Sequence, residues 1–142
     1  MLVKDIMTRE VLSVKKTASL KEVGEILKSK RISGLPVVDE ENRIVGIITL
    51  TDMLRILDRI YKWKELEKFE PEISFGGMFE KEKTDSVVSD FMTKDVFSLS
   101  EDDPLEEVMK LMFSKGVHTL PVTKGGKLIG VVGKRDLVYS CF

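Results

Sequence analysis

The sequence predicts an α+β fold in which two copies of a strand-helix-strand-strand-helix unit pack sheet to sheet, with their helices outside. Two observations lead to this prediction. The chain contains a long internal repeat, and each copy shows the pattern of an amphipathic helix followed by that of a β-hairpin. Because the whole chain has 142 residues, one copy alone is too small to bury its apolar face, and the two copies are expected to share a core.

The internal repeat aligns without a gap at a shift of 85 residues, which lays residues 88–122 over residues 3–37. In this alignment "VSDFMTKDVFSL" lies over "VKDIMTREVLSV", and both copies end in "LPV". One deletion in the following turn changes the shift to 84 and pairs two glycines and two aspartates: Gly46 with Gly130, and Asp52 with Asp136. Self-similarity of this extent indicates two copies of one supersecondary unit.

Helix and hairpin patterns follow the same order in both copies. In the first, Ser19 stands three residues before Glu22, a capping box that predicts a helix from residue 20 onward. In the second, Asp103 is the predicted cap and Pro104 the first helical residue. A short apolar strand, a polar turn and a second strand then predict a hairpin, and a further helix is expected to start near the repeated aspartate.

The repeat divides the chain into three predicted segments: a first repeat over residues 1–57, a helical and loop insertion over 58–86, and a second repeat over 87–142. Helical spacing continues into the insertion, which holds the only tryptophan, Trp63, and is broken at Pro71 and at the glycine pair 76–77. We expect an extended helix and a loop that pack on the core or on another subunit. A lid over a ligand is the alternative.

Composition and charge argue against several classes of partner. The 23 basic residues nearly balance the 24 acidic ones, so the broad basic field that binds nucleic acid is missing. No apolar run approaches the roughly 18 residues of a membrane span, and the N-terminus lacks the pattern of a signal peptide. The only cysteine, Cys141, has no disulfide partner in the chain. We therefore expect a cytoplasmic protein, and its single asparagine and lack of glutamine are typical of a thermophile.

Catalytic motifs are missing from the sequence. It contains no nucleophile elbow, no Walker lysine loop, no zinc-ligand set and no positioned acid and base. His118 is the only histidine, which excludes a site with several histidines from one chain. We expect neither an enzyme nor a required metal or cofactor.

From Val3 to about Val138, the chain contains two copies of the motifs "VxD(I/F)MT", "LxEV", "LPV" and "G(I/V)(I/V)" followed by aspartate. This duplicated series resembles a tandem pair of cystathionine-β-synthase (CBS) domains, or Bateman module. The resemblance implies a regulatory module. Members commonly bind AMP, ADP, ATP or S-adenosylmethionine in clefts between the two copies, and commonly form dimers.

The first copy matches the family pattern G-x-x-(T/S)-x-x-D in full. The resemblance assigns Asp52 to the ribose hydroxyls, Thr49 to the phosphate or ribose, and Ile47 to the adenine pocket. A carboxylate suits a ribose because it can accept a hydrogen bond from each of two adjacent hydroxyls. The opposing copy is expected to complete this first-ranked cleft with Val96, Phe97 and Pro121 beside the base, and with His118 and Arg135 beside the phosphates.

The second copy departs from the pattern because Gly133 stands in place of the threonine. By pseudo-symmetry, the second and weaker cleft is expected to use Asp136, Val131, Val11, Leu12, Ser33 and Pro36, with Thr51 in place of Arg135. Because its cations are fewer, we expect it either to be empty or to prefer adenosine or S-adenosylmethionine. In an alternative without any ligand, both aspartates only stabilise the starts of their helices.

The resulting prediction is a non-catalytic homodimeric module that binds AMP, ADP or ATP between its repeats and acts as an energy or metabolite sensor for an unidentified partner protein. Two alternatives are a ligand-free dimerisation or interaction module, and a binder of S-adenosylmethionine.

Overall fold

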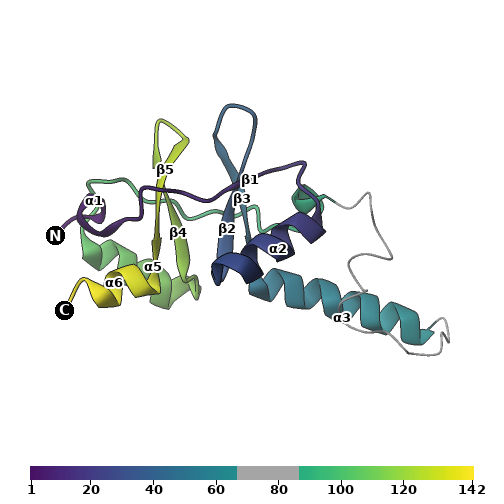
Figure 1. The fold of residues 1–142 in the computed structure, drawn as a ribbon. Coiled ribbons are helices and arrows are strands. Elements are labelled where there is room, and N and C mark those ends of the chain that lie inside the picture. The colour runs from purple at the N-terminus through teal and green to yellow at the C-terminus, as the bar shows by residue number, and fades with distance from the viewer. Residues whose placement is uncertain (67–86) are drawn as a thin grey trace.

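The computed structural model describes residues 1–66 and 87–142 of the chain (Figure 1). The expected break at Pro71 and at the glycine pair 76–77 lies outside these residues, and the side chain of Trp63 is not described either. The packing expected for this part of the insertion therefore stays a prediction.

The first repeat folds in the predicted order of strand, helix, strand, strand and helix: β1 (Val14–Lys15), α2 (Leu20–Lys30), β2 (Gly34–Val38), β3 (Ile44–Thr49) and α3 (Leu50–Leu66). A short helix, α1 (Val3–Ile6), precedes it. The second repeat follows with η2 (Val88–Asp90), α5 (Leu105–Lys115), β4 (Thr119–Lys124), β5 (Lys127–Gly133) and α6 (Lys134–Tyr139). In the position of β1, the second repeat has a parallel bridge between Leu99 and Val122. The predicted α+β fold is confirmed.

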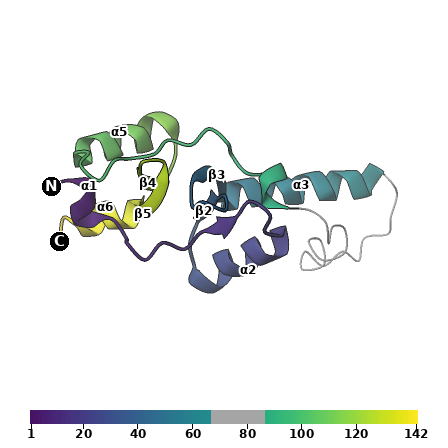
Figure 2. The same cartoon turned by 90° about the horizontal axis from the view of Figure 1, so that it is seen from above.

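Two small sheets form the centre of the molecule. β1 pairs in parallel with β2, which pairs antiparallel with β3, and β4 pairs antiparallel with β5. Both hairpins shift register at equivalent positions, between Val37 and Val38 and between Val122 and Thr123. The hairpins stand side by side with their tips directed away from the long helices (Figure 1). Seen from above, α2 and α6 lie on one side of the hairpins and α5 on the other (Figure 2).

The two hairpins contact each other both at the starts of β2 and β4 and at the tips. A Cβ on Gly34, at the start of β2, would lie 3.3 Å from Oγ1 of Thr119 at the start of β4. At the tips, the N–H of Leu128 donates to the carbonyl of Asn42 at 3.0 Å, and Nδ2 of Asn42 donates to the carbonyl of Leu128 at 3.1 Å. The sheet of one repeat is therefore held directly against the sheet of the other.

The starts of the two equivalent helices differ. Oγ of Ser19 accepts a hydrogen bond from the N–H of Glu22 at 3.1 Å, so the predicted cap of α2 is confirmed. The predicted cap of α5 is wrong, because the carboxylate of Asp103 accepts from the N–H of Ser100 at 2.8 Å instead. Pro104 is extended, with ψ of 154°, and is itself the N-cap of α5. The aspartate thus closes the preceding turn, and the helix begins one residue later than predicted.

α3 runs through the start of the predicted insertion and is the longest described helix, with 17 residues. Within the described ranges, no helix combines the length and the apolar character needed to cross a membrane.

Each repeat completes the core of the other with its N-terminal segment. The core built on α5, β4 and β5 contains Val3 and Met7 from the first repeat. The core built on α2, β2 and β3 contains Val88 from the second, with Phe91 and Met92 packed against it. The expected shared core therefore takes the form of an exchange of equivalent segments between the repeats.

Backbone hydrogen bonds fix these exchanged segments. Thr8 and Val131 exchange two hydrogen bonds, at 2.9 and 3.0 Å. The equivalent pair, Thr93 and Ile47, does the same at 2.8 and 2.9 Å. Each segment thus adds a residue to the edge of the opposite hairpin, directly beside the helix that carries the repeated aspartate.

The repeated glycines leave room for the exchanged segments. A Cβ on Gly46 would lie 2.4 Å from Sδ and 2.8 Å from Cγ of Met92. A Cβ on Gly130 would lie 2.7 Å from Sδ of Met7 and 3.3 Å from the carbonyl of Thr8. A Cβ at either glycine would therefore force the methionine to shift.

We therefore expect Gly46→Ala to lower the free energy of unfolding by about 1–3 kcal/mol, the usual cost of overpacking a core. A matched control is Gly24→Ala in α2, where the nearest atom, Cε of Met53, would lie 3.5 Å away. There alanine should stabilise the helix by up to about 1 kcal/mol. Urea denaturation of the two variants measures both effects, and equal stability of Gly46→Ala and the wild type would contradict the close approach.

Candidate ligand-binding cleft

A cleft of about 720 Å³ opens between the two repeats. The first repeat contributes residues of the exchanged N-terminal segment, one face of α2, the loop into β2 and the first turn of α3. The second repeat contributes the loop into β4, part of β5 and the first turn of α6. A volume of this size suits a ligand such as a nucleotide.

The cleft brings together residues that the sequence analysis assigned to two different sites. From the predicted second cleft it includes Asp136, Val131, Leu12, Ser33 and Pro36. From the predicted first cleft it includes His118 and Arg135. The remaining predicted site residues do not line it: Asp52, Thr49, Ile47, Val96, Phe97, Pro121, Val11 and Thr51. The two basic residues expected beside Asp52 thus line the cleft of Asp136, and their assignment to a ligand stays a prediction.

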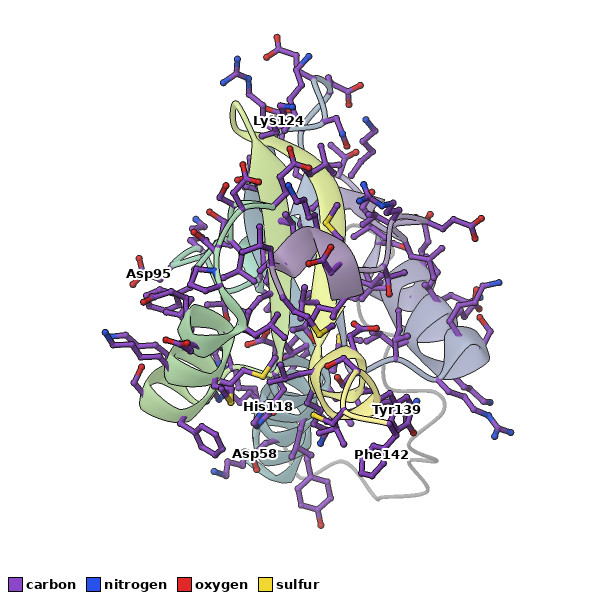
Figure 3. All side chains as sticks on the ribbon, turned by 90° about the vertical axis from the view of Figure 1, so that its left-hand side faces the viewer. Asp58, Asp95, His118, Lys124, Tyr139 and Phe142 are labelled. Atoms are coloured by element: carbon purple, nitrogen blue, oxygen red, sulfur yellow. The ribbon has the colours of Figure 1, made fainter. Side chains whose placement is uncertain are left out.

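Figure 3 shows His118 near the helical end of the molecule and Lys124 at the hairpin tip, at the opposite end of β4. The carbonyl of His118 accepts a hydrogen bond from the N–H of Lys134, the first residue of α6, at 3.3 Å. This bond holds the loop before β4 against the helix that carries Asp136.

Asp136 is half-buried at the start of α6 and uses part of its capacity to accept hydrogen bonds. Oδ2 accepts from the N–H of Gly133 at 2.7 Å, and Oδ1 accepts from Oγ1 of Thr8 at 3.2 Å. Among the described residues, no basic side chain forms an ion pair with it. A carboxylate has about four acceptor positions, so Asp136 retains some for a ligand.

Asp52 is more fully engaged by the protein itself. It is 6% exposed, and Oδ2 accepts from the N–H and Oγ1 of Thr49 at 2.9 and 3.0 Å. Oδ1 accepts from Oγ1 of Thr93 at 3.2 Å and lies 3.6 Å from Nη1 of Arg55. Three hydrogen bonds and an ion pair leave this carboxylate less capacity for a ribose.

Two sequence differences explain this contrast. At the shift of 84 residues, Gly133 corresponds to Thr49 and Tyr139 corresponds to Arg55. Asp136 consequently has neither the hydroxyl nor the guanidinium that engage Asp52. The departure from the family pattern, which predicted a weaker cleft, therefore leaves the carboxylate more available.

The surroundings of Asp136 and of Asp52 also differ in the size of their side chains. Gly24 and Leu12 line the Asp136 cleft, and their counterparts at the shift of 85 are Met109 and Phe97. Nζ of Lys115 lies 5.3 Å from the centre of the Phe97 ring. At these two positions the Asp136 side thus has the smaller side chains.

The sequence analysis missed several residues that line the cleft: Thr8, Glu10, Gly24, Leu27, Lys28, Arg31, Ile32, Gly34, Leu50, Met53, Thr119, Gly133 and Lys134. Part of this set could have been found. Positions 24, 27, 28 and 31 share one helical face by their spacing, and the threonine of the repeated "MT" pair bonds the opposite aspartate in both copies.

The family model of the CBS domain matches residues 3–59 and 88–141, and so covers both repeats. The chain belongs to the CBS domain family. A solved CBS domain pair, that of protein MJ0100 in complex with 5′-methylthioadenosine and S-adenosyl-L-methionine, covers 100% of both chains with a TM-score of 0.77 and 25% identity. CBSX2 in complex with AMP covers 99% of this chain and 95% of its own, with a TM-score of 0.76 and 26% identity. The tandem CBS architecture is therefore confirmed.

A longer relative extends the comparison. The uncharacterized protein MJ1225 of Methanocaldococcus jannaschii is 27% identical over 136 residues, which cover 96% of this chain. The chain spans 41% of the length of that relative.

The two aspartates should differ in their contribution to stability. We expect Asp52→Ala to lower the free energy of unfolding by about 1–3 kcal/mol, because it leaves buried hydrogen-bond donors without their acceptor. Asp136→Ala should cost less, since Asp136 is half-buried and makes fewer bonds. Parallel urea titrations of both variants provide the measurement, and equal losses would show that the two carboxylates are equally engaged.

Proposed function

We propose that the chain is a non-catalytic regulatory module that binds an adenosine-containing ligand in the Asp136 cleft and signals its presence to a partner protein. The observation that carries this proposal is the half-buried carboxylate of Asp136, which lines a cleft of about 720 Å³ and lacks an ion-pair partner among the described residues. A carboxylate in such a cleft can accept hydrogen bonds from both hydroxyls of a ribose.

The remaining walls suit the other parts of such a ligand. Leu12, Pro36 and Val131 provide apolar surface for a purine base, as is usual in nucleotide pockets. Relatives support the same ligand class, since the MJ0100 pair was solved with 5′-methylthioadenosine and S-adenosyl-L-methionine and CBSX2 with AMP. ADP and ATP belong to the same class and share the ribose and the base.

Regulation would follow because both repeats line the cleft. A ligand that contacts both repeats favours one relative orientation of them, to the extent that it binds this orientation more tightly than others. Leu50 and Met53 line the cleft from the first turn of α3, and α3 extends away from the hairpins (Figure 1). We propose α3 and the insertion after it as the route to a regulated partner protein.

We expect a thermal-shift panel of adenosine, AMP, ADP, ATP, S-adenosylmethionine and GMP to show a larger rise in Tm with adenosine and the adenine nucleotides than with GMP. A ligand at 100 times its Kd adds about 2.7 kcal/mol of apparent stability.

In calorimetric titrations, Asp136→Ala should weaken AMP binding by about tenfold or more, the cost of losing charged hydrogen bonds. Asp52→Ala, measured below its Tm, is the matched control.

The outcomes separate the possible assignments. If Asp52→Ala loses affinity and Asp136→Ala keeps it, the ligand occupies the first-ranked cleft of the sequence analysis, and our placement is wrong. If no adenine compound binds, the proposed ligand is wrong, and a ligand-free interaction module takes its place.

As an assembly we propose a homodimer. Leu54 on α3, Phe113 on α5 and Tyr139 on α6 are 65%, 88% and 69% exposed, and large exposed apolar side chains favour burial against another protein. Sedimentation velocity should give about twice the chain mass of 16.1 kDa, and Phe113→Glu should shift the protein toward the monomer. A wild-type monomer at high micromolar concentration would contradict the proposal.

A further inference from the structure

The Asp136 cleft carries an excess of basic side chains in a chain whose total charge is nearly balanced. Four lysine and arginine residues line it: Lys28, Arg31, Lys134 and Arg135; His118 lines it as well. The acidic residues in the lining are Glu10 and Asp136. Within residues 1–66 and 87–142, none of these four basic side chains has a hydrogen-bond or ion-pair partner. No hydrogen bond or ion pair among the described residues therefore neutralises their charge.

The excess of basic side chains is found around Asp136 and not at the equivalent positions around Asp52. The counterparts of Lys28, Arg31 and Arg135 in the other repeat are Phe113, Gly116 and Thr51, all of which are uncharged. Because the backbone is repeated and the charges are not, the fold itself does not require basic residues at these positions.

Arg31 gives the clearest indication that one of these charged residues serves a purpose other than folding. It caps the C-terminus of α2 with φ of 52° and ψ of 45°, in the left-handed region. Its counterpart in the second repeat, Gly116, has φ of 65°. A glycine avoids the cost of about 1 kcal/mol that a side chain incurs there. The first repeat therefore keeps a strained arginine where glycine would fold better, and its side chain lines the cleft.

We infer that the Asp136 cleft selects its ligand by the number of phosphates, so that affinity rises from adenosine through AMP to ADP and ATP. This inference rests on the proposed function. Arginine can form paired hydrogen bonds to phosphate oxygens, and lysine provides a compact positive charge. S-adenosylmethionine carries a positive sulfonium, which the same side chains repel. The order reverses the preference for less phosphorylated ligands that the sequence analysis expected of this cleft.

Calorimetric titration of the wild-type chain with adenosine, AMP, ADP, ATP and S-adenosylmethionine tests the order. We expect ATP to bind about tenfold or more tightly than AMP, consistent with charged hydrogen bonds. The affinity for ATP should fall as salt rises from about 50 to 500 mM, whereas that for adenosine should change little, because salt screens only the charged part of the interaction.

Arg31→Gly separates the ligand contact from the fold. It should leave Tm unchanged or raised, since glycine suits the left-handed backbone, while ATP affinity falls about tenfold and adenosine affinity stays within about twofold. Lys28→Gln should weaken ATP binding in the same direction. Lys30→Gln is the matched control, because Lys30 lies on the same helix but does not line the cleft.

Each outcome decides one question. If adenosine, AMP and ATP bind equally, the inference is wrong while the proposed function stands. If none of them binds, the proposed function itself fails. If Arg31→Gly and Lys28→Gln both bind ATP as tightly as Lys30→Gln does, the side chains of Arg31 and Lys28 do not contact the phosphates and the inference is overturned.

Discussion

The exchange of N-terminal segments is the constraint on which the rest of the structure depends. Neither repeat can close its own core, and Val3 and Val88 each complete the core of the opposite copy. The two glycines of the repeat admit the methionines of these segments, and the same segments place Thr8 beside Asp136 and Thr93 beside Asp52. Core closure and the geometry of the aspartates are therefore determined together, and a change that displaces one segment affects both.

A common backbone with different side chains gives the two repeats different properties. Around Asp52, threonine and arginine occupy the carboxylate. Around Asp136, the equivalent residues are Gly133 and Tyr139, and the carboxylate keeps acceptor capacity toward a cleft. Duplication thus allowed one copy to stabilise the fold with its aspartate while the other kept its aspartate available.

Much of the fold followed from the sequence because it depends on local patterns and on the repeat. The hairpins, the helices after them and the cap at Ser19 are of this kind. The cap predicted at Asp103 was wrong because a carboxylate can bond backward in the chain as well as forward, and only the turn decides which. Arg135 was assigned to the cleft of Asp52 although it lines that of Asp136, because pseudo-symmetry pairs positions and does not indicate which copy faces which cleft. The left-handed backbone of Arg31 was missed as well, although Gly116 at the equivalent position of the repeat indicated it.

Because α3 is long, a small rotation at its first turn would move its other end by a larger distance. Its first turn borders the cleft at Leu50 and Met53, and its 17 residues correspond to about 25 Å of helix. A rigid rotation of about 5° at the first turn would therefore displace the end near Leu66 by about 2 Å, given the rise of about 1.5 Å per residue. A displacement of sub-ångström size at the cleft would be enlarged in this way to the scale of a side-chain contact, at a point far from the cleft.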